Sequence, residues 1–345
     1  MNTLIRMPNW LGDAVMATPA LRCLLDHARD RLGRDSAAVV VGSPAVAEML
    51  SGLDAHVVAD PSKGWRRAGG NWRLGRRLRR EHGPFAWGVA FTASFPTRLM
   101  LSASGAPVRV GARRGLADAL LTQAVTIDNK LHVAEFYQRI ADHVISPDGT
   151  ATSTGATCLP TPWRKSPANL ASPSHRPFVA INPGATYGSA KRWPPDRFAE
   201  VARALGKSHD VVIVGGPGER EMGDHIERRL IEWGVAGHRN LVGKTSLREL
   251  MEWLDRAELL VTNDSGPMHI ANALGTPLVA IFGPTNHLKT CPWRGEAVEL
   301  VRRPVACAPC MKRRCPFPHH ACMNDIPSAD VIAAAQRLLC RHQAA

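Results

Sequence analysis

The chain alternates short apolar runs with longer stretches in which apolar residues recur at helical spacing. Runs of strand length occupy residues 2–7, 37–41 and 87–91 in the first half, and residues 178–182, 210–214 and 258–262 in the second. Helical stretches lie between them. This alternation predicts an α/β protein with parallel sheets in both halves. Residues 146–177 are rich in Ser, Thr, Pro and Ala without apolar periodicity, which predicts a linker between two domains.

Three predicted strands of the second half end in polar loops that contain glycine. The strand at 258–262 leads into residues 263–266, whose types turn a chain and open a helix, with His269 on the first turn. The loop after 178–182 carries Gly184 and Lys191 before a helix that starts at Pro194. Because ligands bind at the carboxyl ends of parallel strands, and helix starts attract anions, these loops predict a diphosphate site. The alternative for each loop taken alone is a capped helix.

The third loop, residues 215–220, places Glu219 where an acidic side chain can hold a ribose hydroxyl. The Walker spacing of glycine, lysine and serine or threonine is absent, which weakens an ATPase interpretation.

The amino-terminal strand leads through a loop with Gly12 into a helix, and Asp13 stands at or near the start of that helix. One interpretation is an N-cap or a partner of the helix dipole, which stabilises a helix by about 1 kcal/mol. The other is a carboxylate base at the mouth of a strand. The residues alone favour the cap.

Four segments in this order, residues 5–21, 182–194, 240–247 and 263–269, resemble the motifs of glycosyltransferase family 9. The resemblance implies a GT-B fold, in which two Rossmann-like domains face each other across a cleft. We expect an acceptor-binding domain at residues 1–160, a nucleotide-sugar-binding domain at 175–325, and a C-terminal helix within 326–345 that packs back on the first domain.

The implied reaction is an inverting transfer of L-glycero-D-manno-heptose from ADP-heptose to the inner-core heptose of lipopolysaccharide. By resemblance, Asp13 is the general base and Lys191 stabilises the leaving ADP, with no cofactor required for the transfer. The residues expected at the donor are Thr186, Tyr187, Lys191, Glu219, Thr245, Asp264, Ser265, Gly266 and His269. Those expected at the acceptor are Asn9, Trp10, Gly12, Lys63, Arg66, Arg67, Arg113 and Arg114.

The net charge of +13 is concentrated in residues 63–80. A solvated helix face is the ordinary explanation of such a run. With Arg113 and Arg114, the run could instead form a basic rim for an anionic acceptor at an anionic membrane surface. A nucleic acid would also be attracted, but no nucleic-acid-binding motif accompanies the charge. No run is long and apolar enough to span a bilayer, and the start lacks a signal-peptide pattern. We therefore expect a cytoplasmic protein, at most peripheral to the inner membrane.

Four of the eight cysteines crowd into sixteen residues: Cys307, Cys310, Cys315 and Cys322. In a reducing compartment such a cluster indicates a structural zinc or an iron–sulfur cluster. The alternative is an irregular loop with free, partly buried thiols. In either case we expect the segment to brace the loop before the final helix.

Two other functions stay open. One is a related transferase that acts on the first-heptose acceptor or uses another nucleotide sugar. The other is a non-catalytic protein that binds nucleic acid or metal, based on the positive charge and the cysteines.

Overall fold

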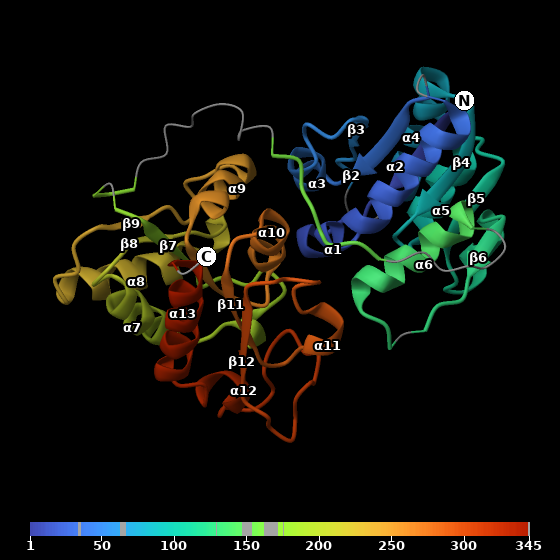
Figure 1. Cartoon of the computed structure of the whole chain (residues 1–345). Helices are drawn as coiled ribbons and strands as arrows, with labels where there is room; N and C mark the ends of the chain where they lie inside the picture. The colour runs from blue at the N-terminus through green and yellow to red at the C-terminus, as the bar shows by residue number, and fades with distance from the viewer. Residues whose placement is uncertain are drawn as a thin grey trace. The chain divides into compact units, whose positions relative to one another are not determined.

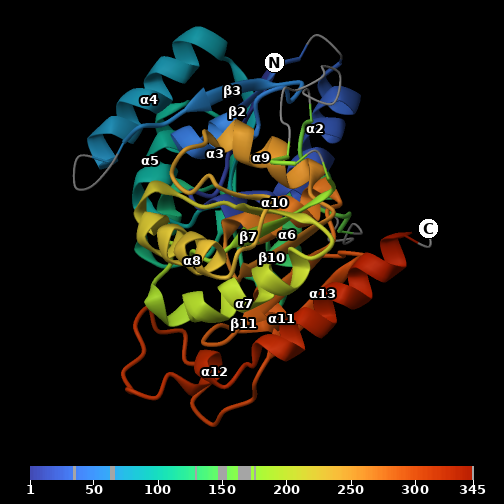
Figure 2. The same cartoon turned by 90° about the vertical axis from the view of Figure 1, so that its left-hand side faces the viewer.

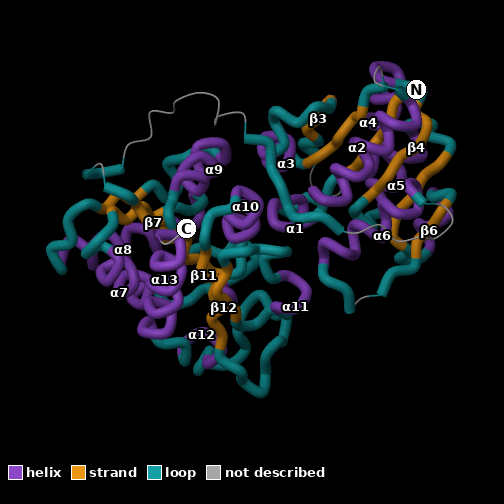
Figure 3. The backbone as a smooth tube through the Cα atoms, viewed as in Figure 1, coloured by secondary structure: helices purple, strands orange, loops and turns teal. Residues whose placement is uncertain are grey.

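The computed structural model describes residues 1–33, 36–62, 67–128, 130–146, 154–161, 172–174 and 176–343. The chain divides into two compact units, Met1–Thr161 and Pro162–Ala345. Each unit has a six-stranded parallel sheet with helices beside it, as Figures 1 and 3 show. The predicted α/β fold with two Rossmann-like units, as in GT-B proteins, is confirmed. Most of the predicted linker, residues 146–177, falls outside the described residues.

The sheet of the first unit has the strand order β3-β2-β1-β4-β5-β6, and all its neighbours pair in parallel. Its strands are β1 (Asn2–Arg6), β2 (Ala38–Gly42), β3 (His56–Ala59), β4 (Phe85–Ala90), β5 (Val108–Ala112) and β6 (Gln123–Val125). The order reverses between β1 and β4, so the loops after these two strands diverge. Such a reversal leaves a crevice at the carboxyl ends of the strands, where ligands bind in open α/β sheets.

The helices of the first unit are α1 (Leu11–Met16), α2 (Thr18–Leu32), α3 (Pro44–Met49), α4 (Arg67–His82), α5 (Phe95–Ala103) and α6 (Val133–Ile145). Helix α2 packs against α6, and α4 packs against α5. The buried side chains of Leu4, Val39, Leu78 and Phe85 belong to the core between the strands and α4 and α5. The central strands β1 and β2 are almost wholly buried, which explains their continuous apolar runs.

The sheet of the second unit has the order β12-β11-β10-β7-β8-β9, again parallel throughout. Its strands are β7 (Phe178–Asn182), β8 (Asp210–Ile213), β9 (His238–Asn240), β10 (Leu259–Asn263), β11 (Leu278–Phe282) and β12 (Val298–Arg302). Here the order reverses between β7 and β10. The two loops that carry Lys191 and Asp264 in the sequence therefore start from adjacent strands at the crevice.

The helices of the second unit are α7 (Pro195–Leu205), α8 (Arg220–Glu232), α9 (Leu247–Arg256), α10 (Gly266–Leu274), α11 (His287–Thr290), α12 (Ala321–Asn324) and α13 (Ser328–Gln343). Short 3-10 turns occupy Ser189–Lys191 and Pro217–Glu219. Helix α10 ends at Gly275, whose φ of 85° is the left-handed conformation of a helix C-cap. Helix α9 is capped by Ser246, which forms a capping box with Glu249.

Helix α13 packs along α7 and over β10, β11 and β12, all within the second unit (Figures 1 and 2). Its Val331, Ala335 and Leu338 are buried in the same core as Trp193 and Phe198. The core that α13 shares is thus that of the second unit. Its contact with the first domain stays a prediction.

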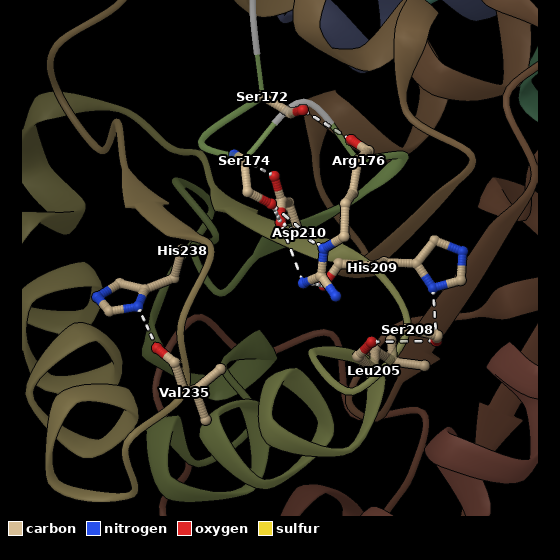
Figure 4. A network of polar contacts seen from close by, with 9 residues as sticks. All are labelled: Ser172, Ser174, Arg176, Leu205, Ser208, His209, Asp210, Val235 and His238. Carbon is tan, nitrogen blue, oxygen red and sulfur yellow. Dashed lines mark hydrogen bonds and ion pairs between the residues drawn. The ribbon is translucent and has the colours of Figure 1, made fainter.

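A polar network joins the chain that enters the second unit to the start of β8 (Figure 4). The Asp210 carboxylate, with 0% of its side chain exposed, accepts hydrogen bonds from the Ser174 backbone N–H at 2.7 Å and from Arg176 Nε at 3.1 Å. Because Asp210 stands at the amino end of its strand, this network lies at the edge of the sheet opposite the crevice. Its role is to anchor the entering chain.

Candidate functional site

In the first unit, Asp13 lies beside the crevice at the carboxyl end of β1. The chain leaves β1 through residues 7–10, and Trp10 is the N-cap residue of α1. The N-cap interpretation of Asp13 is therefore wrong. Asp13 stands in the first turn of α1, where the positive end of the helix dipole stabilises a carboxylate.

Asp13 is a partly buried residue near the buried Tyr137 of α6. Burial raises the pKa of Tyr137 well above its ordinary value, and the charge of Asp13 raises it further. The Tyr137 ring meets the edge of Phe91, just after β4, with centroids 5.3 Å apart. Asp13 thus stands close to residues from both sides of the reversal between β1 and β4.

A buried ion pair supports the loop that precedes Asp13, and sequence reasoning missed it. Arg6, the last residue of β1, bonds Asp60 at 2.9 Å with both side chains 1% exposed. The same Nη2 donates to Asn9 Oδ1 at 3.0 Å. Ser43, after β2, donates its hydroxyl to the Asn9 carbonyl at 3.1 Å. The ends of β1, β2 and β3 are therefore tied to Asn9. A lone arginine at a strand end carries no pattern that would reveal this pair.

The residues predicted for the acceptor divide into three groups. Asn9 is held by the network just described, Gly12 lies in α1, and the Trp10 side chain is 55% exposed. Arg113 and Arg114 are exposed and directly follow β5. Lys63 and Arg66 lie outside the described residues, as does the side chain of Arg67.

The predicted basic rim stays a prediction, because Lys63, Arg66 and the side chain of Arg67 lie outside the described residues. Helix α4 begins after β3, whereas Arg113 and Arg114 follow β5, and three strands stand between β3 and β5. The far end of α4 lies at the amino edge of the sheet, because the His82 carbonyl accepts a hydrogen bond from Asn2, at the start of β1, at 2.7 Å. The arginines of the last turn, Arg79 and Arg80, are therefore remote from the crevice. Each residue of a helix advances about 1.5 Å along the helix axis, so the charges of α4 lie at different distances from the crevice. The number of charges in the sequence does not show these distances.

In the second unit, buried amides join the two strands at the reversal. The Asn182 Oδ1 at the end of β7 accepts hydrogen bonds from the hydroxyls of Thr262 at 3.1 Å and Ser265 at 3.0 Å. The Asn263 side chain, at the end of β10, donates to the Pro183 carbonyl at 2.7 Å. These contacts lock the two crevice loops together. Asn182 and Asn263 belong to the motifs, but their bridging depends on strand neighbours that the sequence does not reveal.

Lys191 and Asp264 meet across the same reversal. Lys191 Nζ lies 2.6 Å from Asp264 Oδ2, with the two side chains 12% and 4% exposed. The Thr285 hydroxyl, after β11, donates to the same carboxylate oxygen at 2.5 Å. Asp264 therefore fixes the ammonium group of Lys191 at the mouth of the crevice, next to the start of α10. Thr285 was not predicted for this site.

Glu219 lies against the glycines at the ends of β7 and β8. Its Oε2 accepts a hydrogen bond from the Gly216 backbone N–H at 2.8 Å. A Cβ added at Gly184 would lie 1.8 Å from the Glu219 carboxyl carbon, so only glycine leaves room there. Burial raises the pKa of Glu219 above its usual value, although the Gly216 N–H and the charge of Arg192 oppose the shift. The carboxylate is positioned to accept hydrogen bonds from a ligand in the crevice.

The other residues predicted for the donor border this region. Thr186 is exposed in the loop after β7, and Thr245 is half-buried after β9. Ser265 is the N-cap residue of α10 and Gly266 is its first residue, so the free N–H groups of the helix start lie beside Asp264. His269 is buried within α10. Tyr187 donates its hydroxyl to the Met311 carbonyl at 2.7 Å.

The four clustered cysteines line one cavity of about 160 Å³ together with His319 and His320. Burial and the three neighbouring cysteines raise the pKa of Cys322 to about 11. Within the described ranges, no three Cys, His, Asp or Glu side chains are arranged to hold a metal ion. All eight cysteines are free thiols, and those of the cluster are buried or partly buried. The predicted zinc or iron–sulfur cluster has no support in this geometry.

Across the part of the chain that the structure describes, no helix has the length and apolar character needed to cross a membrane.

Known proteins resemble the chain over almost its whole length. It is 31% identical to lipooligosaccharide heptosyltransferase 2 of Campylobacter jejuni, covering 98% of each chain. It is 29% identical to lipopolysaccharide heptosyltransferase 2 of Escherichia coli K12, covering 100% of each. The solved structure of E. coli ADP-heptose lps heptosyltransferase II matches with a TM-score of 0.81 and 25% identity, covering 99% of this chain and 100% of that one. The model of glycosyltransferase family 9 (heptosyltransferase) matches residues 71–321. The chain therefore belongs to glycosyltransferase family 9.

Proposed function

We propose that this protein is an inverting heptosyltransferase of the heptosyltransferase II type. It transfers L-glycero-D-manno-heptose from ADP-heptose to the inner-core heptose of lipopolysaccharide. The observation that carries the proposal is the arrangement around Lys191, Asp264 and Glu219. A fixed ammonium group, a helix start and a buried carboxylate gather at one sheet reversal, which suits a nucleoside diphosphate.

The donor half of the mechanism concerns the leaving group. As the bond between the anomeric carbon and the phosphate oxygen breaks, its electron pair stays on ADP and the diphosphate gains negative charge. Lys191 and the N–H groups at the start of α10 stabilise that charge. Thr186 contributes a hydroxyl from the same loop. Asp264 holds Lys191 in place, and Glu219 accepts hydrogen bonds from the adenosine ribose.

The acceptor half depends on Asp13. An acceptor hydroxyl attacks the anomeric carbon from the face opposite the leaving ADP, so the configuration inverts. Asp13 takes the proton of that hydroxyl as the new carbon–oxygen bond forms. Arg113 and Arg114, exposed after β5, attract the phosphates and carboxylates of the acceptor. Contact with the anionic surface of the inner membrane would follow from the same charges.

No cofactor takes part in these steps, because the protein's own cation and helix start supply the positive charge. The metal predicted at the four cysteines is outside the mechanism proposed here. Metal analysis of the purified, reduced protein tests that prediction separately.

The test is ADP release by the wild-type and Asp13→Asn proteins, supplied with ADP-heptose and a lipid A acceptor that already carries one heptose. We expect acceptor-dependent release by the wild type and a loss of about 100-fold or more in Asp13→Asn, the usual effect of removing a general base. The affinity for ADP should be nearly equal in both proteins, because Asp13 lies in the other unit. Activity retained by Asp13→Asn would refute the base assignment.

The choice of acceptor separates the related transferases. Release only with an acceptor that lacks heptose would move the enzyme to the first heptose. If ADP-heptose gives no ADP release with either acceptor, but another nucleotide sugar is turned over, ADP-heptose is not the donor. The non-catalytic alternative requires that Asp13→Asn leaves function intact, and it predicts salt-dependent binding to oligonucleotides.

A further inference from the structure

We propose that the cysteine segment, residues 307–322, is part of the donor site. It holds the donor loop, residues 184–191, and brings the Arg313 guanidinium beside that loop as a second cation for the diphosphate. The inference rests on the proposed function of the donor loop. Figure 1 shows the chain between β12 and α12 as irregular, and the cysteine segment ends in the first turn of α12.

The cysteine segment is bonded directly to the donor loop at several points. The Ala190 backbone N–H donates to the Arg313 carbonyl at 3.1 Å, and the His320 Nε2 lies 2.8 Å from the Ala190 carbonyl. Both backbone groups of Ala190 are thus engaged by the segment, one residue before Lys191. The position of Lys191 therefore depends on a part of the chain more than a hundred residues away.

Tyr187 is the centre of the contact. Its hydroxyl donates to the Met311 carbonyl at 2.7 Å, and two cations lie close to its ring. Lys191 Nζ is 4.7 Å from the ring centroid and the Arg313 Cζ is 5.3 Å from it. Distances below about 6 Å allow a favourable cation–π interaction. Tyr187 thus places the Arg313 guanidinium on the ring that also contacts Lys191.

The packing between loop and segment is close. A Cβ added at Gly188 would lie 2.2 Å from the Arg313 carbonyl oxygen, so any side chain there would push the segment away. Met311 has a φ of 56° and His320 a φ of 40°, a conformation that costs non-glycine residues free energy. The Met311 N–H donates to the Pro284 carbonyl at 2.8 Å, next to the Thr285 that bonds Asp264.

The charge of Lys191 alone does not balance the charge of the diphosphate, which explains the need for a second cation at the donor loop. Asp264 lies 2.6 Å from Lys191 and offsets its positive charge, whereas departing ADP carries at least two negative charges. The Arg313 side chain is exposed at the loop, and a guanidinium can bond two phosphate oxygens at once. We therefore assign Arg313 to donor binding and Tyr187 to the positioning of both cations.

The first test compares Arg313→Ala with Arg314→Ala, its exposed neighbour, in the reduced full-length protein. ADP affinity is measured by calorimetry, and the KM for ADP-heptose by ADP release. We expect Arg313→Ala to weaken ADP binding about tenfold, the usual order for a lost hydrogen bond to a charged group. The KM for the donor should rise by a similar factor, with the acceptor KM unchanged. Arg314→Ala should behave as wild type. Arg313→Lys should recover only part of the affinity, because an ammonium group keeps the charge but not the paired hydrogen bonds of the guanidinium.

Two further variants test the positioning. Tyr187→Phe removes only the hydroxyl that reaches Met311, and Gly188→Ala forces the segment from the loop. Both should raise the Kd for ADP, and Tyr187→Phe should do so while unfolding at nearly the wild-type temperature. If Arg313→Ala and Gly188→Ala bind ADP as wild type does while Lys191→Ala binds it weakly, the inference fails and the donor site stands. If Lys191→Ala also binds ADP normally, the proposed donor loop itself is wrong.

Discussion

The buried pair of Lys191 and Asp264 combines stability and donor binding, and paired substitutions can separate the two. In Lys191→Met, the Asp264 carboxylate stays 4% exposed and keeps the Thr285 hydroxyl, but it loses its counter-ion at 2.6 Å. Removing one partner of a buried ion pair costs about 3–5 kcal/mol. Because Lys191 is 12% exposed and water can reach the site, we expect the lower end, about 3 kcal/mol.

For a unit of this size, each kcal/mol lowers the melting temperature by about 2–4 °C, so Lys191→Met should lower it by about 6–12 °C. The double variant Lys191→Met with Asp264→Asn buries no unpaired charge and should recover about half of that loss. The assay is thermal unfolding of the wild type, both single variants and the double variant, each with and without saturating ADP.

ADP reports on function in the same experiment, since a ligand that binds the native state raises the melting temperature. The wild type and Asp264→Asn, which both keep the lysine, should be stabilised by ADP. Lys191→Met and the double variant should be stabilised much less at the same ADP concentration, because they bind ADP more weakly. A double variant as unstable as Lys191→Met would refute the pairing argument, and full stabilisation of Lys191→Met by ADP would refute the role of the lysine in donor binding.

Two further predictions concern pH. Because burial raises the pKa of Glu219, the folded protein binds that proton more tightly than the unfolded chain, so this contribution to stability is present at acid pH and lost as pH rises through the raised pKa. Glu219→Gln should therefore melt higher than wild type at pH 7, converge with it in acid, and bind ADP more weakly. Burial opposes ionisation of Asp210 as well, but hydrogen bonds from Ser174 and Arg176 outweigh it and hold the pKa of Asp210 below its ordinary 3.8. Its contribution is present above that value and lost as pH falls through the lower folded pKa, so Asp210→Asn should melt below wild type at pH 7 and approach it below about pH 4. A melting-temperature difference that does not change with pH would contradict either assignment.

The sequence by itself determined the alternation of strands and helices, because burial of both sheet faces requires continuous apolar runs of strand length. It also indicated which loops form the donor site. Glycine after a strand lets the backbone approach a phosphate, and serine and lysine can bond the phosphate oxygens. The reaction was inferred from the resemblance of four motifs to glycosyltransferase family 9. These features are local, so a linear pattern records them.

Tertiary structure alone decided which distant residues meet. The Arg6–Asp60 pair depends on the ends of β1 and β3, and Asn182 reaches Thr262 only because β7 and β10 are neighbours at the reversal. The strand order, which places β2, β1 and β4 between β3 and β5, decides how far the start of α4 lies from Arg113 and Arg114. The contact of Arg313 with Tyr187 lies in a segment without regular periodicity. Pairing between strands and contacts between loops depend on the path of the chain through space, and residue spacing along the sequence does not encode that path.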